Sequence, residues 1–128
     1  PFHLGKACKE MGTLQSIVNL LDTRILDYDR KHVSYHLSKR ALMSLTAMMA
    51  LEWAPSIRVN AVAPGLILPP EGESMDYLKN LAHTNPLETI GNVSDLSSAI
   101  QFLIQNTFIT GQTIYVDGGR HLKGRVYE

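Results

Sequence analysis

Three short apolar runs of β type, separated by longer helical patterns, constrain the fold of this chain more than any other feature. The runs cover residues 14–21, 57–62 and 113–117, and helical patterns precede and separate them. Nearly continuous apolar strands that alternate with helices indicate a parallel sheet covered on both faces. We therefore expect an α/β fold. Ligands of such sheets bind beyond the carboxyl ends of the strands, so functional residues should follow the three runs.

The helical segments carry recognisable start and stop signals. The longest covers residues 33–53, is rich in Ala, Leu and Met, and is ended by Pro55. Shorter helices are expected at 1–11, around 75–82, and after Asn92, which can cap a helix together with Asp95. One apolar face of the long helix is predicted from residues that recur at spacings of three or four: Leu37, Ala41, Leu45 and Met48.

Composition excludes several classes of protein. The 128 residues suffice for one domain, and a formal net charge of zero gives no reason to expect nucleic acid or an anionic membrane as a partner. The single cysteine, Cys8, allows no internal disulfide and suits the cytoplasm. No apolar stretch approaches the ~20 residues of a membrane span. The five histidines show no metal-ligand spacing, so no metal site is expected, and His32 and His36 are expected to face solvent.

Tyr35 and Lys39 begin the long helix with the spacing that places two side chains on one face. A nearby ammonium favours the phenolate and should lower the pKa of the tyrosine from its ordinary value near 10. A tyrosine tuned in this way can exchange a proton with a carbonyl, alcohol or imine nitrogen. Alone, the pair is a weak signal, because such spacings are common on helix surfaces. Asp22 lies thirteen residues before Tyr35, at the end of the first predicted strand, and its position strengthens the functional interpretation of the Tyr35–Lys39 pair.

Further segments follow in a recognisable order: Arg58-Val59-Asn60, Pro64-Gly65-Leu66-Ile67, Thr110-Gly111-Gln112 and Val116-Asp117-Gly118-Gly119. Together with Tyr35-x-x-x-Lys39, they resemble the C-terminal half of the short-chain dehydrogenase/reductase family over essentially the whole chain. The resemblance implies the C-terminal portion of a Rossmann-type doubly wound parallel sheet, namely its last three strands and their helices. It also implies a single domain, of which residues 1–128 would form the C-terminal part.

The resemblance assigns roles to individual residues. Tyr35 is similar to the family's catalytic acid or base, and Lys39 to the residue that lowers its pKa and binds the nicotinamide ribose. Residues Pro64, Gly65, Leu66 and Ile67 resemble the stretch whose backbone passes the nicotinamide carboxamide, although a simple turn after the strand would explain Gly65 equally well. The resemblance gives Asn60 a framework role.

Asp22 departs from the family pattern, in which most members carry serine. An ionised carboxylate cannot donate a hydrogen bond to a carbonyl, but it suits a substrate with N–H donors. The pteridine reductase and dihydromonapterin reductase branch is similar in this respect. It implies NADPH-dependent reduction of a pterin-like ring, with NAD as a possible cofactor and Asp22 as a third catalytic residue. Two alternatives remain: a 3-oxoacyl or general carbonyl reductase, or a catalytically incomplete fragment that serves only in assembly.

The glycine-rich phosphate loop of the family has no counterpart in this sequence. We therefore expect these residues to belong to a longer reductase, to form only the nicotinamide side of the cofactor site, and to be inactive alone. The first strand would then have an unpaired edge, which favours association. A homo-oligomer, either a dimer or a tetramer, is expected, with a small molecule as the other partner.

Overall fold

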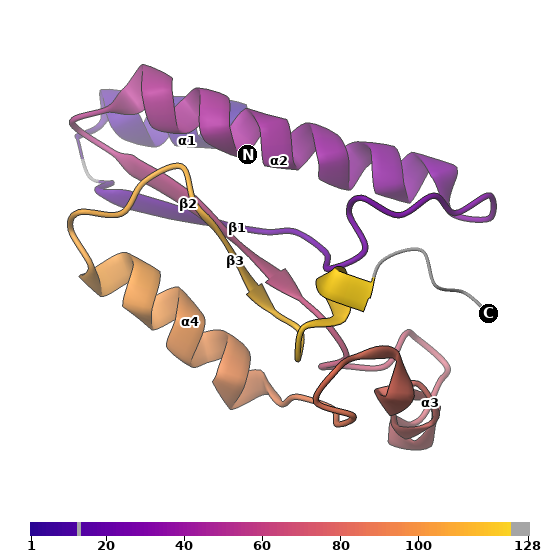
Figure 1. The fold of residues 1–128 in the computed structure, drawn as a ribbon. Coiled ribbons are helices and arrows are strands. Elements are labelled where there is room, and N and C mark those ends of the chain that lie inside the picture. Colours follow the sequence, from indigo (N-terminus) through magenta and orange to yellow (C-terminus); the bar gives the residue numbers. More distant parts are fainter. Residues whose placement is uncertain (13, 124–128) are drawn as a thin grey trace.

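The computed structural model describes residues 1–12 and 14–123 and has three layers (Figure 1). Helices α1 (Phe2–Glu10) and α2 (Val33–Trp53) lie over one face of a three-stranded sheet, and α4 (Val93–Gln105) lies against the other. The short helix α3 (Met75–Asn80) lies beyond the carboxyl ends of the strands. Short 3₁₀ turns occupy Ala82–Thr84 and Arg120–Lys123. No helix in this part of the chain has both the length and the apolar character needed to cross a membrane.

The sheet consists of β1 (Ser16–Leu20), β2 (Arg58–Pro64) and β3 (Thr113–Val116) in that order, and both pairs of strands are parallel. Leu20 pairs with Val62 at one end of the first ladder. The central strand β2 is the most deeply buried, because helices cover both of its faces. The expectation of an α/β fold with a parallel sheet is confirmed, and each strand lies within two residues of its predicted range.

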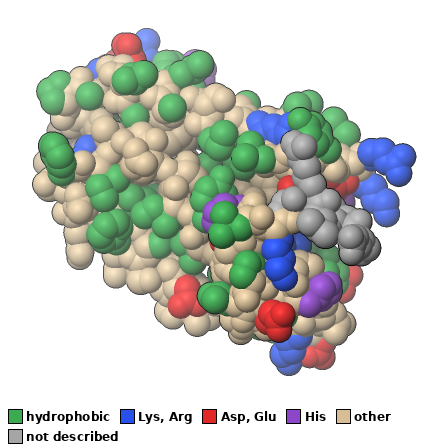
Figure 2. Space-filling model, viewed as in Figure 1, with side chains coloured by type: hydrophobic (Ala, Val, Ile, Leu, Met, Phe, Trp, Pro, Cys, Tyr) green, Lys and Arg blue, Asp and Glu red, His purple; other side chains and the backbone are tan. Residues whose placement is uncertain are grey.

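Helix α2 has the predicted bounds, but a different face of it packs on the sheet. Of the four residues predicted for this face, Leu37, Ala41 and Met48 are exposed, and Leu45 alone is partly buried and packs against the core. The covered face instead carries five buried residues: His36, Thr46, Met49, Ala50 and Trp53. The prediction of the apolar face was wrong because this helix is apolar on more than one side, so periodicity alone could not select the side that packs. The exposed apolar residues contribute to the hydrophobic side chains spread over the surface (Figure 2).

Helix α4 begins as its sequence predicts. The side chain of Asn92 accepts a hydrogen bond from the amide of Asp95, and the Asp95 carboxylate accepts one from the amide of Asn92, which completes a capping box. Leu103 is the buried residue of this helix. Arg58 joins the helix to β2 by donating hydrogen bonds to the carbonyls of Leu103 and Ile104, each at 2.8 Å. These hydrogen bonds fix α4 against the face of the sheet opposite α1 and α2.

Candidate active site

The carboxyl ends of the three strands bring together the segments that the sequence singled out. Asp22 lies two residues beyond β1, and the chain there continues alongside β2. The amide of Leu21 donates to Val62 O at 2.8 Å, and the amide of Thr23 donates to Pro64 O at 3.1 Å. Asp22 therefore lies between two backbone anchors at the mouth of the sheet, where a ligand of a parallel sheet is expected.

Tyr35 and Asp22 are in direct contact. The Tyr35 hydroxyl, in the first turn of α2, donates a hydrogen bond of 2.8 Å to Asp22 Oδ2, and the other carboxylate oxygen accepts from the amide of Arg24 at 2.7 Å. Lys39 lies one turn further along α2, with its Nζ atom 5.7 Å from the centroid of the Tyr35 ring. The same ammonium donates to Leu20 O at 2.8 Å. The three predicted residues thus form one cluster, in which Tyr35 is 44% exposed and accessible to a ligand.

The acidity of Tyr35 differs from the expectation. Burial, the hydrogen bond to Asp22 and the negative charge of Asp22 raise the pKa of Tyr35 to about 12. A pKa lowered by Lys39 was expected, and the net shift is in the opposite direction. The ammonium lies beside the ring and bonds to a backbone carbonyl, whereas the carboxylate contacts the hydroxyl itself. Tyr35 is consequently a protonated donor at neutral pH.

The turn after β2 holds the other predicted residues. The amide of Gly65 donates to Val116 O at 2.9 Å, and Leu66 O accepts from the amide of Gly91 at 3.0 Å. The side chains of Leu66 and Ile67 are buried, so this turn presents mainly its backbone. A Cβ atom on Gly65 would lie 2.7 Å from the Cα and Cβ atoms of Asp117. Close packing against Asp117, just after β3, is therefore sufficient reason for glycine at position 65.

A buried polar cluster beside this turn escaped the sequence analysis. The Thr23 hydroxyl donates to Asp117 Oδ2, and the same carboxylate accepts hydrogen bonds from the amides of Gly119 and His121. The His121 ring, whose Nδ1 lies 2.9 Å from Asp117 Oδ2, stacks on Tyr115 with 4.0 Å between the centroids. The sequence analysis named Asp117 within Val116-Asp117-Gly118-Gly119 but gave it no partner, because nothing local links Thr23 and Asp117, which are 94 positions apart.

The two histidines beside Tyr35 have different environments. His32 is exposed as expected, and its Nδ1 lies 2.8 Å from the carboxylate of Asp29. His36 is only 7% exposed, so the expectation that it faces solvent is wrong. It lies on the face of α2 that packs inward, and its ring stands edge-on to Tyr35 with 5.6 Å between the centroids.

The donor groups of the cluster fit the ribose side of a nicotinamide nucleotide. A lysine ammonium has three N–H donors, and one of those on Lys39 reaches Leu20 O. The remaining donors and the Tyr35 hydroxyl can bind ribose hydroxyl groups from one side of α2. The sequence offers no Gly-x-Gly-x-x-Gly loop for the pyrophosphate. Within the described residues, no group of three His, Cys, Asp or Glu side chains could hold a metal ion.

Known proteins are similar to this chain in sequence and in fold. Dihydromonapterin reductase of Citrobacter koseri is 33% identical over 107 residues, which are 84% of this chain and 45% of that protein. The structure of FolM alternative dihydrofolate reductase 1 from Brucella canis, complexed with NADP, matches with a TM-score of 0.78 and 35% identity over 85% of this chain and 44% of that chain. A 4-hydroxyisoleucine dehydrogenase complexed with NADH matches with a TM-score of 0.81 and 34% identity, covering 94% of this chain and 54% of that chain.

The length of the match limits what these similarities establish. The chain spans about 45% of the length of the curated relatives it matches. A family model described as enoyl-(acyl carrier protein) reductase matches residues 2–121, which is nearly the whole of this chain. The order of the strands and the Tyr35–Lys39 pair indicate the same family as this match. The chain belongs to the short-chain dehydrogenase/reductase family.

Proposed function

We propose that this chain is part of an NADPH-dependent reductase of a pterin-like ring. The observation that carries the proposal is the hydrogen bond of 2.8 Å from the Tyr35 hydroxyl to the Asp22 carboxylate. A carboxylate at this position can accept hydrogen bonds from the N–H groups of a pterin. Its negative charge also keeps Tyr35 protonated, so that Tyr35 has a proton to donate. The similarity to dihydromonapterin reductases, which covers 84% of this chain, supports the same substrate class.

The proposed reaction adds a hydride and a proton across a carbon–nitrogen double bond of the ring. When bound beside Tyr35 and Lys39, the nicotinamide would supply the hydride. Before the substrate binds, Asp22 accepts a hydrogen bond from the single O–H of Tyr35, which a pKa of about 12 keeps protonated at neutral pH. The N–H groups of the substrate then take the place of that hydrogen bond at Asp22, and the Tyr35 hydroxyl turns to the ring nitrogen and donates its proton there. Lys39, close to the Tyr35 ring, opposes the negative charge that the phenolate acquires.

NADPH is the proposed cofactor, with NADH as the alternative, because related structures contain NADP or NADH. Tyr35 and Lys39 would hold the ribose, and the backbone of residues Pro64, Gly65, Leu66 and Ile67 would pass the carboxamide. The 128 residues contribute this half of the site only. We propose that they are inactive without the remainder of the protein, which would carry the pyrophosphate site.

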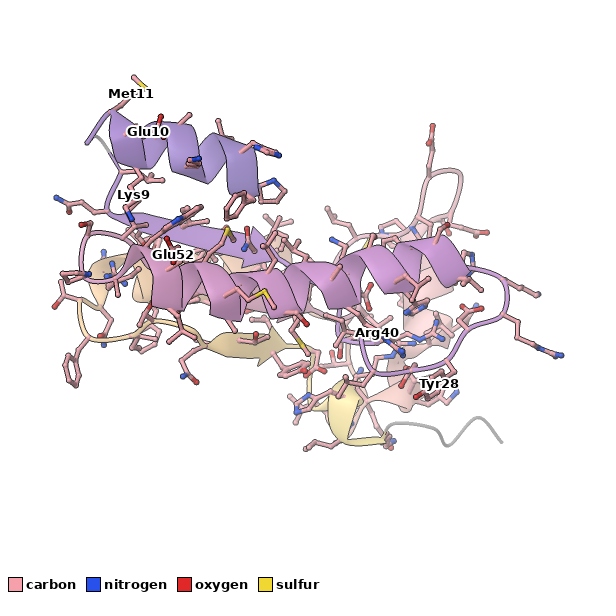
Figure 3. All side chains as sticks on the ribbon, turned by 90° about the horizontal axis from the view of Figure 1, so that it is seen from above. Lys9, Glu10, Met11, Tyr28, Arg40 and Glu52 are labelled. Atoms are coloured by element: carbon pink, nitrogen blue, oxygen red, sulfur yellow. The ribbon has the colours of Figure 1, made fainter. Side chains whose placement is uncertain are left out.

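The test is oxidation of NADPH by the full-length protein with a dihydropterin and, separately, with a simple ketone. Tyr35→Phe should lower kcat for the pterin by about 10²- to 10⁴-fold with a much smaller change in the Kd for NADPH, because the proton donor is lost whereas only one of the proposed ribose contacts is lost with it. Tyr28→Phe is the matched control, since its ring would remain over Arg40 (Figure 3). Good turnover of the ketone without turnover of the pterin would contradict the proposal.

A general carbonyl or 3-oxoacyl reductase is the second candidate. The similarity to a 4-hydroxyisoleucine dehydrogenase favours it, as does the description of the matching family model. Replacing Asp22 by serine separates the two candidates, because a hydroxyl can donate to a carbonyl oxygen and a carboxylate cannot. Asp22→Ser should increase ketone reduction if the second candidate is correct, and should mainly reduce pterin turnover if the first is correct.

We further propose that the protein is a cytoplasmic homo-oligomer, either a dimer or a tetramer. Exposed apolar side chains of α2, among them Leu37, Met48 and Leu51, support an interface on this helix. Light scattering on the purified full-length protein tests the oligomeric state, and a monomer at micromolar concentration would contradict it.

A further inference from the structure

Asp22 lies beyond the end of β1, in a short segment that backbone hydrogen bonds hold against β2. The amides of Leu21 and Thr23, on either side of it, donate to carbonyls of β2 at 2.8 and 3.1 Å. The carboxylate itself accepts from the amide of Arg24 at 2.7 Å and from the Tyr35 hydroxyl at 2.8 Å. The direction of the side chain therefore depends on the backbone conformation of this short segment.

The side chain of Thr23 provides a third anchor, to the residue that follows the last strand of the sheet. Its hydroxyl donates to Asp117 Oδ2, and the two residues are only 5% and 8% exposed. Asp117 is itself held firmly, by the amide of Gly119 at 2.9 Å and by the amide of His121 at 2.8 Å. Burial alone would raise the pKa of Asp117, but the hydrogen bonds from Thr23, His121 and Gly119 keep it below its ordinary value. The acceptor for Thr23 is thus an ionised carboxylate.

Asp117 also packs against Gly65, where an added Cβ atom would approach its Cα and Cβ to 2.7 Å. One buried residue therefore contacts both the segment of Asp22 and the turn after β2. Catalytic groups must hold their geometry to within about 0.5 Å, and neighbouring residues provide that support. We propose that Thr23 and Asp117 are positioning residues, whose hydrogen bond directs the Asp22 carboxylate toward the Tyr35 hydroxyl.

The acidity of the Tyr35 hydroxyl depends on where the Asp22 carboxylate points. Three ionisable side chains face it: the Asp22 carboxylate at 2.8 Å, the Lys39 ammonium 5.7 Å from the ring centroid, and the His36 ring with centroids 5.6 Å apart. Without the Thr23 hydroxyl, Asp22 would be free to turn away, while Lys39 and His36 would keep their positions on α2. The phenol would then lose a hydrogen-bonded negative charge and become more acidic.

The experiment is a titration of Tyr35 in the full-length protein by NMR with ¹³C-labelled tyrosine, assigned with Tyr35→Phe. Thr23→Val keeps the shape of the side chain but removes its hydroxyl, and should lower the pKa of Tyr35 by about one unit or more. Thr23→Ser keeps the hydroxyl and should leave the titration unchanged. Thr46→Val is the matched control, since Thr46 is a buried hydroxyl on α2 that bonds to Asn19 and to Leu42 O.

An unchanged Tyr35 titration in Thr23→Val would overturn the inference, as would an equal shift in Thr46→Val, which would indicate general loosening. If Thr23→Val does not fold, Asp117→Asn carries the same prediction, because it weakens the acceptor for the same hydroxyl. The role in catalysis rests on the proposed function, but the titration needs no substrate. A protein that reduces no pterin contradicts the proposed function, whereas a Tyr35 titration insensitive to Thr23 contradicts this inference alone.

Discussion

At the scale of single residues, burial and Asp22 together make Tyr35 a weaker acid. Burial raises the pKa most, and the Asp22 carboxylate, 2.8 Å from the hydroxyl, raises it further, to about 12. Asp22→Asn should lower this pKa, but not fully to the ordinary value near 10, because burial remains. NMR titration of labelled tyrosine measures the change. Asp76→Asn removes an exposed carboxylate that pairs with Lys79 on α3, and should have no effect.

At the scale of elements, the bounds of α2 could be predicted but its orientation could not. The helical pattern and Pro55 mark the helix well, and the structure begins and ends it at Val33 and Trp53. The face that packs depends on the sheet beneath it. An apolar stripe through Leu37 and Met48 competes with one through Met49 and Trp53, and only the second meets the strands. The burial of His36 follows from that choice, and no local signal in the sequence predicts it.

The segment that leads into α2 is stabilised by Asp29. The hydrogen bond from His32, followed by that from the amide of Lys31, lowers the pKa of Asp29 from 3.8 to about 2. A carboxyl group with a lowered folded-state pKa stabilises the protein above about pH 4 and loses this contribution as the pH falls toward 2. Asp29→Asn should therefore reduce the Tm at pH 5 and have less effect near pH 2.5. A difference in Tm that does not shrink on acidification would contradict this account.

At the scale of the whole molecule, the site depends on contacts between distant parts of the chain. The parallel sheet and the grouping of Asp22, Tyr35 and Pro64 at its carboxyl edge follow from rules about strand order, and could be expected from the sequence. The bond from Thr23 to Asp117 could not, because it depends on the register between β1, β2 and β3 and joins residues 94 positions apart. The raised pKa of Tyr35 was also beyond sequence analysis, since it depends on which charge lies nearer to the hydroxyl.

The proposal that this chain carries only the nicotinamide side of the cofactor site predicts how it binds NADPH. The 128 residues include the proposed ribose ligands Tyr35 and Lys39 but no glycine-rich loop. Binding of the pyrophosphate by such a loop and a helix N-terminus is a major part of dinucleotide recognition. Calorimetric titration with NADPH should therefore detect no binding to the 128-residue chain and clear binding to the full-length protein. Tyr35→Phe in the full-length protein should keep most of that affinity, since it removes one proposed ribose contact while Lys39 retains its hydrogen bond to Leu20 O. If the 128-residue chain, shown to be folded by circular dichroism, bound NADPH as tightly as the full-length protein, the site would not be divided and the nicotinamide side alone would account for cofactor recognition.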